Sequence, residues 1–294
     1  MKTRSSETTY RIFIGVITGM VSFLALYPIY YIVTLSFTSE AEWVAKGGLV
    51  LWVNDPTLAA YRYILGSNSF VLNSFVISVA RTAVGTSFGL VVTCATGYAL
   101  SRRQMPGRTF LTLFVIITIL FNGGLIPTYL VVQGTGLLNT FWVYIIPLAV
   151  YSWGVLVFKQ FFENVPYEIE ESAIIDGASE IALMTRIIVP MSKPVVAAIG
   201  LFLAVIQWNN WFDALIYIRN FRLYPLQLVL RNLFSVGSMA ADTQGSRPDP
   251  TLVRVPEISL KMAVAVIGTV PILMVYPFLQ KYFIKGVYTG SVKG

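Results

Sequence analysis

The sequence offers few side chains that could carry out acid–base or metal chemistry. Among 294 residues there is no histidine and a single cysteine, Cys94. A nucleophile with a histidine base, a histidine-ligated metal and an imidazole proton relay are therefore excluded, and so are an intramolecular disulfide and a cysteine-cluster metal site. We expect no catalytic residue and no metal ligand in this chain.

Acidic side chains are scarce, yet six of the fourteen gather in one short stretch. Pro166 suits the first turn of a helix there, because the acids that follow it favour a helix N-terminus. Gly177 predicts a turn at which a side chain would obstruct a close approach, and a second short helix over 179–188 is expected to end before Pro190. The acids are Glu163, Glu168, Glu170, Glu171, Asp176 and Glu180.

Polar side chains inside apolar stretches form a second candidate site, since such residues usually face a cavity or another helix. Amides and indole rings suit the hydroxyls and the apolar face of a sugar. We predict that a substrate pathway includes Arg81, Gln207, Asn209, Asn210 and Trp211. The alternatives are that the asparagines join helices, that the indole lies at a membrane interface, and that the arginine pairs within the protein.

The elements that position these residues follow from composition. The chain is 56% hydrophobic and only 12% charged, with a mean hydropathy of +0.71, whereas a soluble domain carries about 25% charged residues. Because a spanning helix needs about 20 apolar residues, the charge-free intervals predict an all-α membrane protein with a single domain over 1–294. Its six spans are expected over 12–37, 73–100, 109–132, 138–158, 194–217 and 261–282.

The basic residues predict the orientation, because cytoplasmic flanks carry an excess of Lys and Arg. They place both termini and the loop 163–193 in the cytoplasm, and they explain the net charge of +7 without a nucleic-acid partner. The residues used are Lys2, Arg4, Arg11, Arg102, Arg103, Arg108, Lys281, Lys285 and Lys293.

The outer loop between the fifth and sixth spans is an exception to this rule, with five arginines against three acids. It is expected to dock an acidic binding protein, to attract uronate-containing oligosaccharides, or to be an ordinary solvated loop. The arginines are Arg219, Arg222, Arg231, Arg247 and Arg254, and the acids are Asp242, Asp249 and Glu257.

The acidic loop is the part of the chain that needs a partner. Two short helices with apolar faces outside the bilayer must be covered by protein or by the lipid interface. Acidic residues disfavour anionic lipid headgroups, so a protein partner is expected. A solvated loop is the alternative.

The spacing within this loop resembles the EAA motif of ABC importer permeases. That motif runs Glu-Ala-Ala, three residues, Gly, nine residues, Ile, one residue, Leu-Pro, and the spacing here is complete, with Ser and Val at two positions. The run that includes Asp176 has the form common in sugar importers. The matching residues are Glu171, Ser172, Ala173, Gly177, Ile187, Val189 and Pro190.

The resemblance covers nearly the whole chain and is to the carbohydrate family, relatives of the smaller permease of the maltose importer. It is carried further by Asp55–Leu58, Tyr98–Arg102, Trp208–Asn209 and the C-terminal run. Within that family the chain looks most like the lipoprotein/polygalacturonan and alginate oligosaccharide permeases. The resemblance implies the type I ABC importer permease fold and a coupling helix that docks on a cytoplasmic ATPase, with Glu171 contacting basic groups.

The resemblance also implies the partners: a second homologous permease in a heterodimer, two cytoplasmic ATP-binding subunits, an extracytoplasmic solute-binding protein, an oligosaccharide and the lipid of a bacterial inner membrane. The sequence contains no Walker A pattern, so ATP and Mg are expected on the partner ATPase and no cofactor on this chain. A secondary transporter of a polar solute is the alternative function. Such proteins usually carry intramembrane carboxylates, and Asp213 lies only near a span end.

Overall fold

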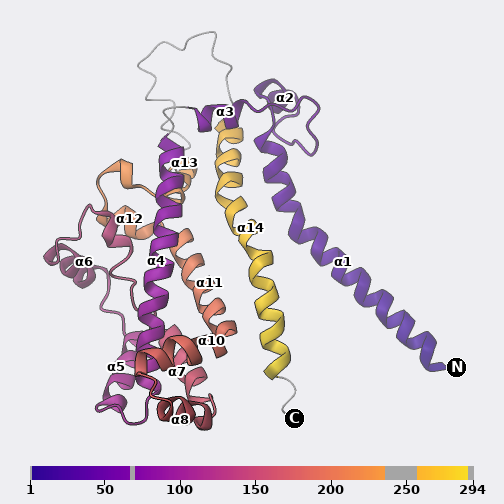
Figure 1. Cartoon of the computed structure of the whole chain (residues 1–294). Coiled ribbons are helices and arrows are strands. Elements are labelled where there is room, and N and C mark those ends of the chain that lie inside the picture. Colours follow the sequence, from indigo (N-terminus) through magenta and orange to yellow (C-terminus); the bar gives the residue numbers. More distant parts are fainter. Residues whose placement is uncertain (1, 67–69, 236–256, 291–294) are drawn as a thin grey trace. The chain divides into compact units, whose positions relative to one another are not determined.

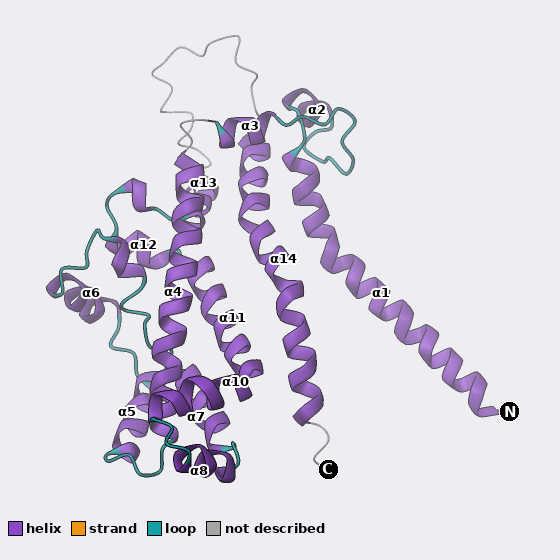
Figure 2. Ribbon diagram, viewed as in Figure 1, coloured by secondary structure: helices purple, strands orange, loops and turns teal. Residues whose placement is uncertain are grey.

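The structure, a computed structural model, describes residues 2–66, 70–235 and 257–290. These residues form helices and connecting loops, with no strand in the described ranges (Figure 2), which confirms the predicted all-α class. The chain divides into two compact units. Unit 1 consists of Met1–Leu72 and Asn232–Val270, and unit 2 consists of Asn73–Arg231 and Pro271–Gly294. The predicted outer-loop residues Asp242, Arg247, Asp249 and Arg254, and Lys293 of the tail, lie outside the described residues.

Unit 1 contains a long apolar helix and a compact loop. Helix α1 covers Lys2–Ser36, α2 covers Glu40–Ala45, α3 covers Ala59–Leu65, and α14 begins in this unit and covers Glu257–Gly290 (Figure 1). The apolar part of α1, Tyr10–Ser36, is long enough to cross a bilayer, and its most apolar window buries no residue within the chain. This surface therefore requires lipid or another protein as its neighbour.

The loop after α1 is held together by the carboxylate of Glu42, whose residue is only 8% exposed. It accepts hydrogen bonds from Lys46 Nζ at 2.7 Å and from the backbone N–H of Asn54 at 2.8 Å. Lys46 also donates to the carbonyl of Trp52 at 2.5 Å. These bonds, that of Lys46 above all, lower the pKa of Glu42. One carboxylate therefore closes a loop of more than ten residues and keeps its shape.

Unit 2 is arranged along the long helix α4, Phe70–Ser101. Figure 1 shows α5, α7 and α8 gathered at one end of α4, and α12 and α13 toward its other end. The further elements are α5 Arg108–Leu120, α6 Leu125–Gly134, the 3₁₀-helix η1 Phe141–Tyr144, α7 Ser152–Glu163, α8 Tyr167–Ile175, α9 Glu180–Ala182, the π-helix η2 Leu183–Ile188, α10 Val189–Met191, α11 Lys193–Asn209, α12 Phe212–Tyr217, the 3₁₀-helix η3 Phe221–Leu223 and α13 Leu226–Ser235.

Helices α4 and α7 approach closely because residue 97 is a glycine. A Cβ atom at Gly97 would lie 2.5 Å from the Cβ of Phe158 and 3.1 Å from the carbonyl oxygen of Val155. Phe158 is fully buried and stacks on Phe162 with ring centroids 5.4 Å apart. The absence of a side chain at this position lets the end of α4 pack directly on α7, next to the loop 163–193.

The predicted spans agree with the structure where one helix is continuous. Three helical stretches are long and apolar enough to cross a membrane, and they correspond to the predicted first, second and sixth spans. Two bent helix pairs bring the number to five at most if each pair is one span. The three continuous stretches are Tyr10–Ser36, Phe70–Ser101 and Glu257–Met274.

The structure differs from the other three predicted ranges. The range 109–132 consists of α5 and α6, which are bent by 120° at the glycine-rich break between them. The range 194–217 is interrupted between α11 and α12 at Asn210. The range 138–158 is not one helix, since η1 ends at Tyr144 and α7 begins at Ser152. Pro147 lies in this gap, where it has no N–H to donate and disfavours a helical residue before it.

We expect Gly97→Val to destabilise unit 2 by about 1–3 kcal/mol, because the new side chain overlaps Phe158 and the α7 backbone. Thermal unfolding of the detergent-solubilised protein should show a lowered midpoint. Gly134→Val is the matched control, since no atom lies within 4 Å of a Cβ at Gly134. Equal midpoints for the two variants would contradict the close α4–α7 contact.

Candidate functional site

The loop 163–193 contains the first candidate site, and its first helix begins as the sequence predicts. Pro166 is the residue before α8, and Glu168 and Glu170 lie in the first turn of that helix. Ala173 is the buried residue of α8, at 7% exposure, and packs in the core with Tyr98 and Phe158. The other motif residues of this helix and turn, Glu171, Ser172, Asp176 and Gly177, are exposed.

The turn after α8 requires glycine for a reason different from the predicted one. Gly177 has a φ of +82°, and nothing lies within 4 Å of a Cβ at this position, so a close approach does not explain the residue. Its N–H bonds to the carbonyl of Ile174 at 3.0 Å, and the N–H of Ala178 bonds to the carbonyl of Ala173 at 2.9 Å. This pair of bonds is a Schellman motif, which needs a left-handed residue at its centre.

The sequence predicted that the second short helix of the loop ends before Pro190. In the structure the helical turns continue through this residue. Short helix α9 leads into the π-helix η2, and α10 then carries Pro190 near its start. The wider π turn and the position of Pro190 at the start of a new turn accommodate its missing N–H. Ile188 is fully buried, and Ile187 and Val189 pack against the same core, so this half of the motif anchors the loop.

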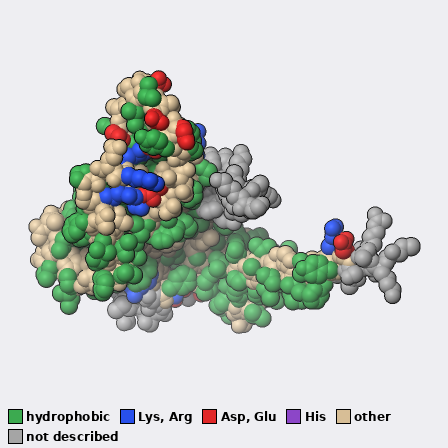
Figure 3. Space-filling model, turned by 90° about the horizontal axis from the view of Figure 1, so that it is seen from below, with side chains coloured by type: hydrophobic (Ala, Val, Ile, Leu, Met, Phe, Trp, Pro, Cys, Tyr) green, Lys and Arg blue, Asp and Glu red, His purple; other side chains and the backbone are tan. Residues whose placement is uncertain are grey.

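The exposed surface of the loop mixes acids with large apolar side chains. Tyr167, Ile174, Ile175 and Ile181 are 63%, 52%, 78% and 73% exposed, beside the exposed carboxylate of Glu171. Figure 3 is viewed from the end at which α8 lies in Figure 1, and it shows Lys, Arg, Asp and Glu side chains close together on that face. Large apolar side chains exposed together on one surface are typical of a site that binds another protein or lipid.

Ion pairs tie the loop to the neighbouring turn at residues 101–108. Arg102 pairs with Glu170 at 2.5 Å, Arg108 pairs with Glu163, and Lys159 also reaches Glu163 at 3.0 Å. A hollow of about 630 Å³ lies between this turn and the loop. From the sequence, these arginines predict only the orientation of the chain in the membrane. Their ion pairs depend on tertiary packing and are not predicted.

The second candidate site is centred on Arg81, whose side chain is fully buried. Its guanidinium pairs with the Asp213 carboxylate at 2.6 and 3.1 Å and lies 4.2 Å from the ring centre of Tyr144. It also donates to the carbonyl of Asn210 at 2.9 Å and twice to Oε1 of Gln207, at 3.2 and 3.3 Å. These five hydrogen bonds use the full donor capacity of a guanidinium.

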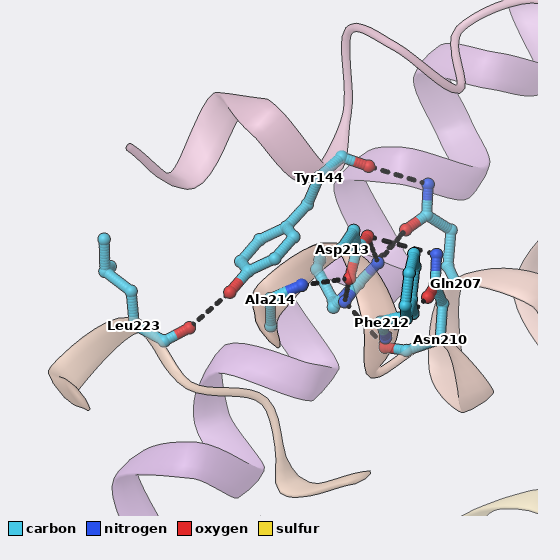
Figure 4. Close-up of polar contacts among 8 residues, drawn as sticks. Tyr144, Gln207, Asn210, Phe212, Asp213, Ala214 and Leu223 are labelled. Atoms are coloured by element: carbon cyan, nitrogen blue, oxygen red, sulfur yellow. Dashed lines mark hydrogen bonds and ion pairs between the residues drawn. The ribbon is translucent and has the colours of Figure 1, made fainter. Parts of the chain in front are cut away.

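The partners of Arg81 are themselves fixed by further bonds, as Figure 4 shows. Gln207 donates to the carbonyl of Tyr144 at 3.1 Å, and Asn210 donates to Asp213 at 3.1 Å. A Cβ at Gly85 would lie 2.5 Å from Nε2 of Gln207, so this glycine makes room for the amide. The network joins α4 to α11, α12 and η1.

The five predicted pathway residues are therefore only partly together. Arg81, Gln207 and Asn210 share the buried network, and a substrate contact by Arg81 would require one of its bonds to open. Asn209 is exposed, and the half-buried ring of Trp211 has the Arg231 guanidinium 4.0 Å from its centre. Their role in a substrate pathway stays a prediction, whereas pairing of Arg81 within the protein is what the structure contains.

The sequence did not predict Asp213 as the buried partner of Arg81. A signal for it was present, because every other acid between residues 73 and 231 lies in 163–180. A buried arginine requires a counter-charge, and Asp213 was the one acid outside the loop that could supply it. No group of three or more His, Cys, Asp or Glu that could hold a metal occurs among the described residues.

Known proteins have a similar sequence and fold. Residues 89–288 match the family of binding-protein-dependent transport system inner membrane components, and the chain belongs to that family. The crystal structure of a bacterial ABC transporter involved in the import of the acidic polysaccharide alginate contains a chain with a TM-score of 0.85 and 28% identity, covering 95% of this chain and 98% of that one. The resemblance to ABC importer permeases of the carbohydrate family is confirmed.

Two relatives from Bacillus subtilis (strain 168) match over nearly their whole length. Protein LplC is 44% identical over 276 residues, which cover 94% of this chain and 92% of LplC. The polygalacturonan/rhamnogalacturonan transport system permease protein YtcP is 39% identical over 280 residues, which cover 94% of this chain and 95% of YtcP. YtcP is named as a transport system permease protein, and the fold of the chain is that of an ABC importer permease.

Breaking the Arg81–Asp213 pair should be strongly destabilising. We expect Arg81→Gln or Asp213→Asn to cost about 3–5 kcal/mol, since either change leaves a buried charge without its partner. The double variant should lose less than the sum of the single variants, as measured by thermal unfolding in detergent. Arg219→Gln, at an exposed arginine of the same unit, is the control. Additive losses would show that the two residues are not coupled.

Proposed function

We propose that this chain is the membrane-spanning permease subunit of an ATP-driven, binding-protein-dependent importer of oligosaccharides. In this proposal the loop 163–193 docks onto a cytoplasmic ATPase, and both termini lie on the same side. ATP and Mg are held by two ATPase subunits, a second homologous permease completes the pathway, and a solute-binding protein delivers the sugar outside an inner membrane. Six spans remain the proposed arrangement.

The observation that carries this proposal is that one side of the loop 163–193 is buried in the core and the other side is exposed. Ala173 and Ile188 fix the loop in the core, whereas Glu171 and Ile175 of the same loop are exposed. A loop that is rigidly anchored on one side and apolar and acidic on the other presents a preformed docking surface. Movement of a docked ATPase would then reach the transmembrane helices through this loop, and the pathway would alternate between its two openings.

Glu171→Lys should weaken assembly with the ATPase. Loss of one charge-assisted hydrogen bond, together with a new like charge, is expected to lower ATPase co-purification about tenfold or more. Asp55→Lys makes the same charge change at an exposed acid of the loop between α2 and α3, and serves as the control. Full assembly and ATP-driven uptake by Glu171→Lys would count against the docking role. Uptake driven by an ion gradient without ATP would favour a secondary transporter.

Acidic oligosaccharides are the proposed substrate class. Arg219, Arg222 and Arg231 are exposed, and apart from Asp213, buried against Arg81, the acids of the range 73–231 all lie in 163–180. A guanidinium recognises a carboxylate through two parallel N–H donors, and these donors stay accessible when the ion stacks on a ring. Arg231 on Trp211 is such a pair. The names of YtcP and of the alginate importer support acidic sugars as substrates.

The reconstituted importer should transport galacturonate oligomers faster than neutral oligosaccharides of equal length. We expect Arg231→Gln to reduce uptake of the acidic oligomers about five- to tenfold and to leave neutral uptake nearly unchanged, because one charged contact is lost. Arg62→Gln, at an exposed arginine of α3, is the control. Equal losses for neutral and acidic sugars would instead assign the arginine to docking of the binding protein.

A further inference from the structure

Two side chains at the end of α4 contact each other: Tyr98 lies in the last turn of the helix, and Arg102 is the residue directly after its end. The guanidinium of Arg102 lies 4.2 Å from the ring centre of Tyr98. Arg102 follows Tyr98 by four residues, and both side chains contact the loop 163–193. Tyr98 is 7% exposed, and the Arg102 side chain is 20% exposed, which makes this contact more than a solvated surface pair.

These two residues bind both helices of the loop. Arg102 contacts the first helix, and Tyr98 contacts the second. Arg102 makes a two-point ion pair with Glu170 of α8, at 2.5 and 3.1 Å. The Tyr98 hydroxyl donates to the carboxylate of Glu180 in α9 at 2.6 Å. Glu170 and Glu180 lie on opposite sides of the turn at Gly177. The end of α4 therefore connects the two sides of this turn.

We propose that Tyr98 and Arg102 are positioning residues for energy coupling, which fix α8 and α9 to the end of α4. This inference rests on the proposed docking of the loop onto an ATPase. Core packing of Ala173 and Ile188 anchors the loop, and the two carboxylate contacts add a direct connection from the end of α4 to each side of the turn at Gly177. Without these contacts, part of a displacement of the loop would be absorbed in the turn. With them, α8, α9 and the last turn of α4 move as one body.

Helix α4 then extends the connection to the other polar cluster. Arg81 lies on α4 as well, 17 residues before Tyr98, and therefore about 25 Å from it at 1.5 Å per residue. Arg81 in turn binds Asn210 and Asp213 at the break between α11 and α12. A displacement of the loop that moves α4 therefore reaches the segment that contains the proposed pathway residues.

The test uses the complete importer with its ATPase, second permease and binding protein. For Arg102→Gln and Tyr98→Phe we expect the ATPase to stay bound, while the sugar imported per ATP hydrolysed falls about fivefold or more, the size of a typical coupling between sites. The charge exchange Arg102→Glu with Glu170→Arg should restore at least part of that ratio. Arg103→Gln, an exposed neighbour of Arg102, should leave it unchanged.

Two outcomes would overturn the inference. The first is an unchanged ratio of sugar to ATP in both variants. The second is loss of the ATPase subunits from the complex, since the two residues would then serve assembly and not coupling. Failure of the proposed function looks different, because the unaltered importer would show no ATP-driven uptake, or Glu171→Lys would assemble and transport normally.

Discussion

The structure depends most on the requirement that a charged arginine cannot be left alone in an apolar interior. Arg81 has no exposed surface, so each of its donors must find a partner inside the protein. Those partners come from Gln207, Asn210 and Asp213, and the carbonyl of Asn210 is free to accept because α11 ends there. One buried ion thus binds the end of α11, the break that follows it and the start of α12 to one side of α4.

The few polar side chains of this chain also bear on its function. The sequence contains no histidine. Its polar side chains are spent on joining elements: Arg81 joins the broken helix, and Arg102 and Tyr98 join the acidic loop. Membership of the binding-protein-dependent transport family agrees with a protein that takes part in moving a solute.

Sequence patterns predicted what depends on one segment alone. Apolar length identifies α1, α4 and α14, and the spacing after Pro166 identifies the acidic loop. Hydropathy did not predict three local features: the bend between α5 and α6, the gap around Pro147 and the π turn before Pro190. Hydropathy reports that a stretch avoids water, but it does not report how the backbone hydrogen bonds of that stretch are satisfied. The partner of Arg81 escaped because the pair is 132 residues apart and only tertiary packing brings it together.

Helix α4 is long as well as unbroken, and its length has a consequence for reach. Its 32 residues extend about 48 Å at 1.5 Å per residue, whereas the hydrocarbon core of a bilayer is about 30 Å thick. The excess must be taken up by tilt or by projection into the headgroup layer and beyond. A helix longer than the hydrocarbon core can carry Tyr98, in its last turn, and the residues that follow it beyond the lipid chains.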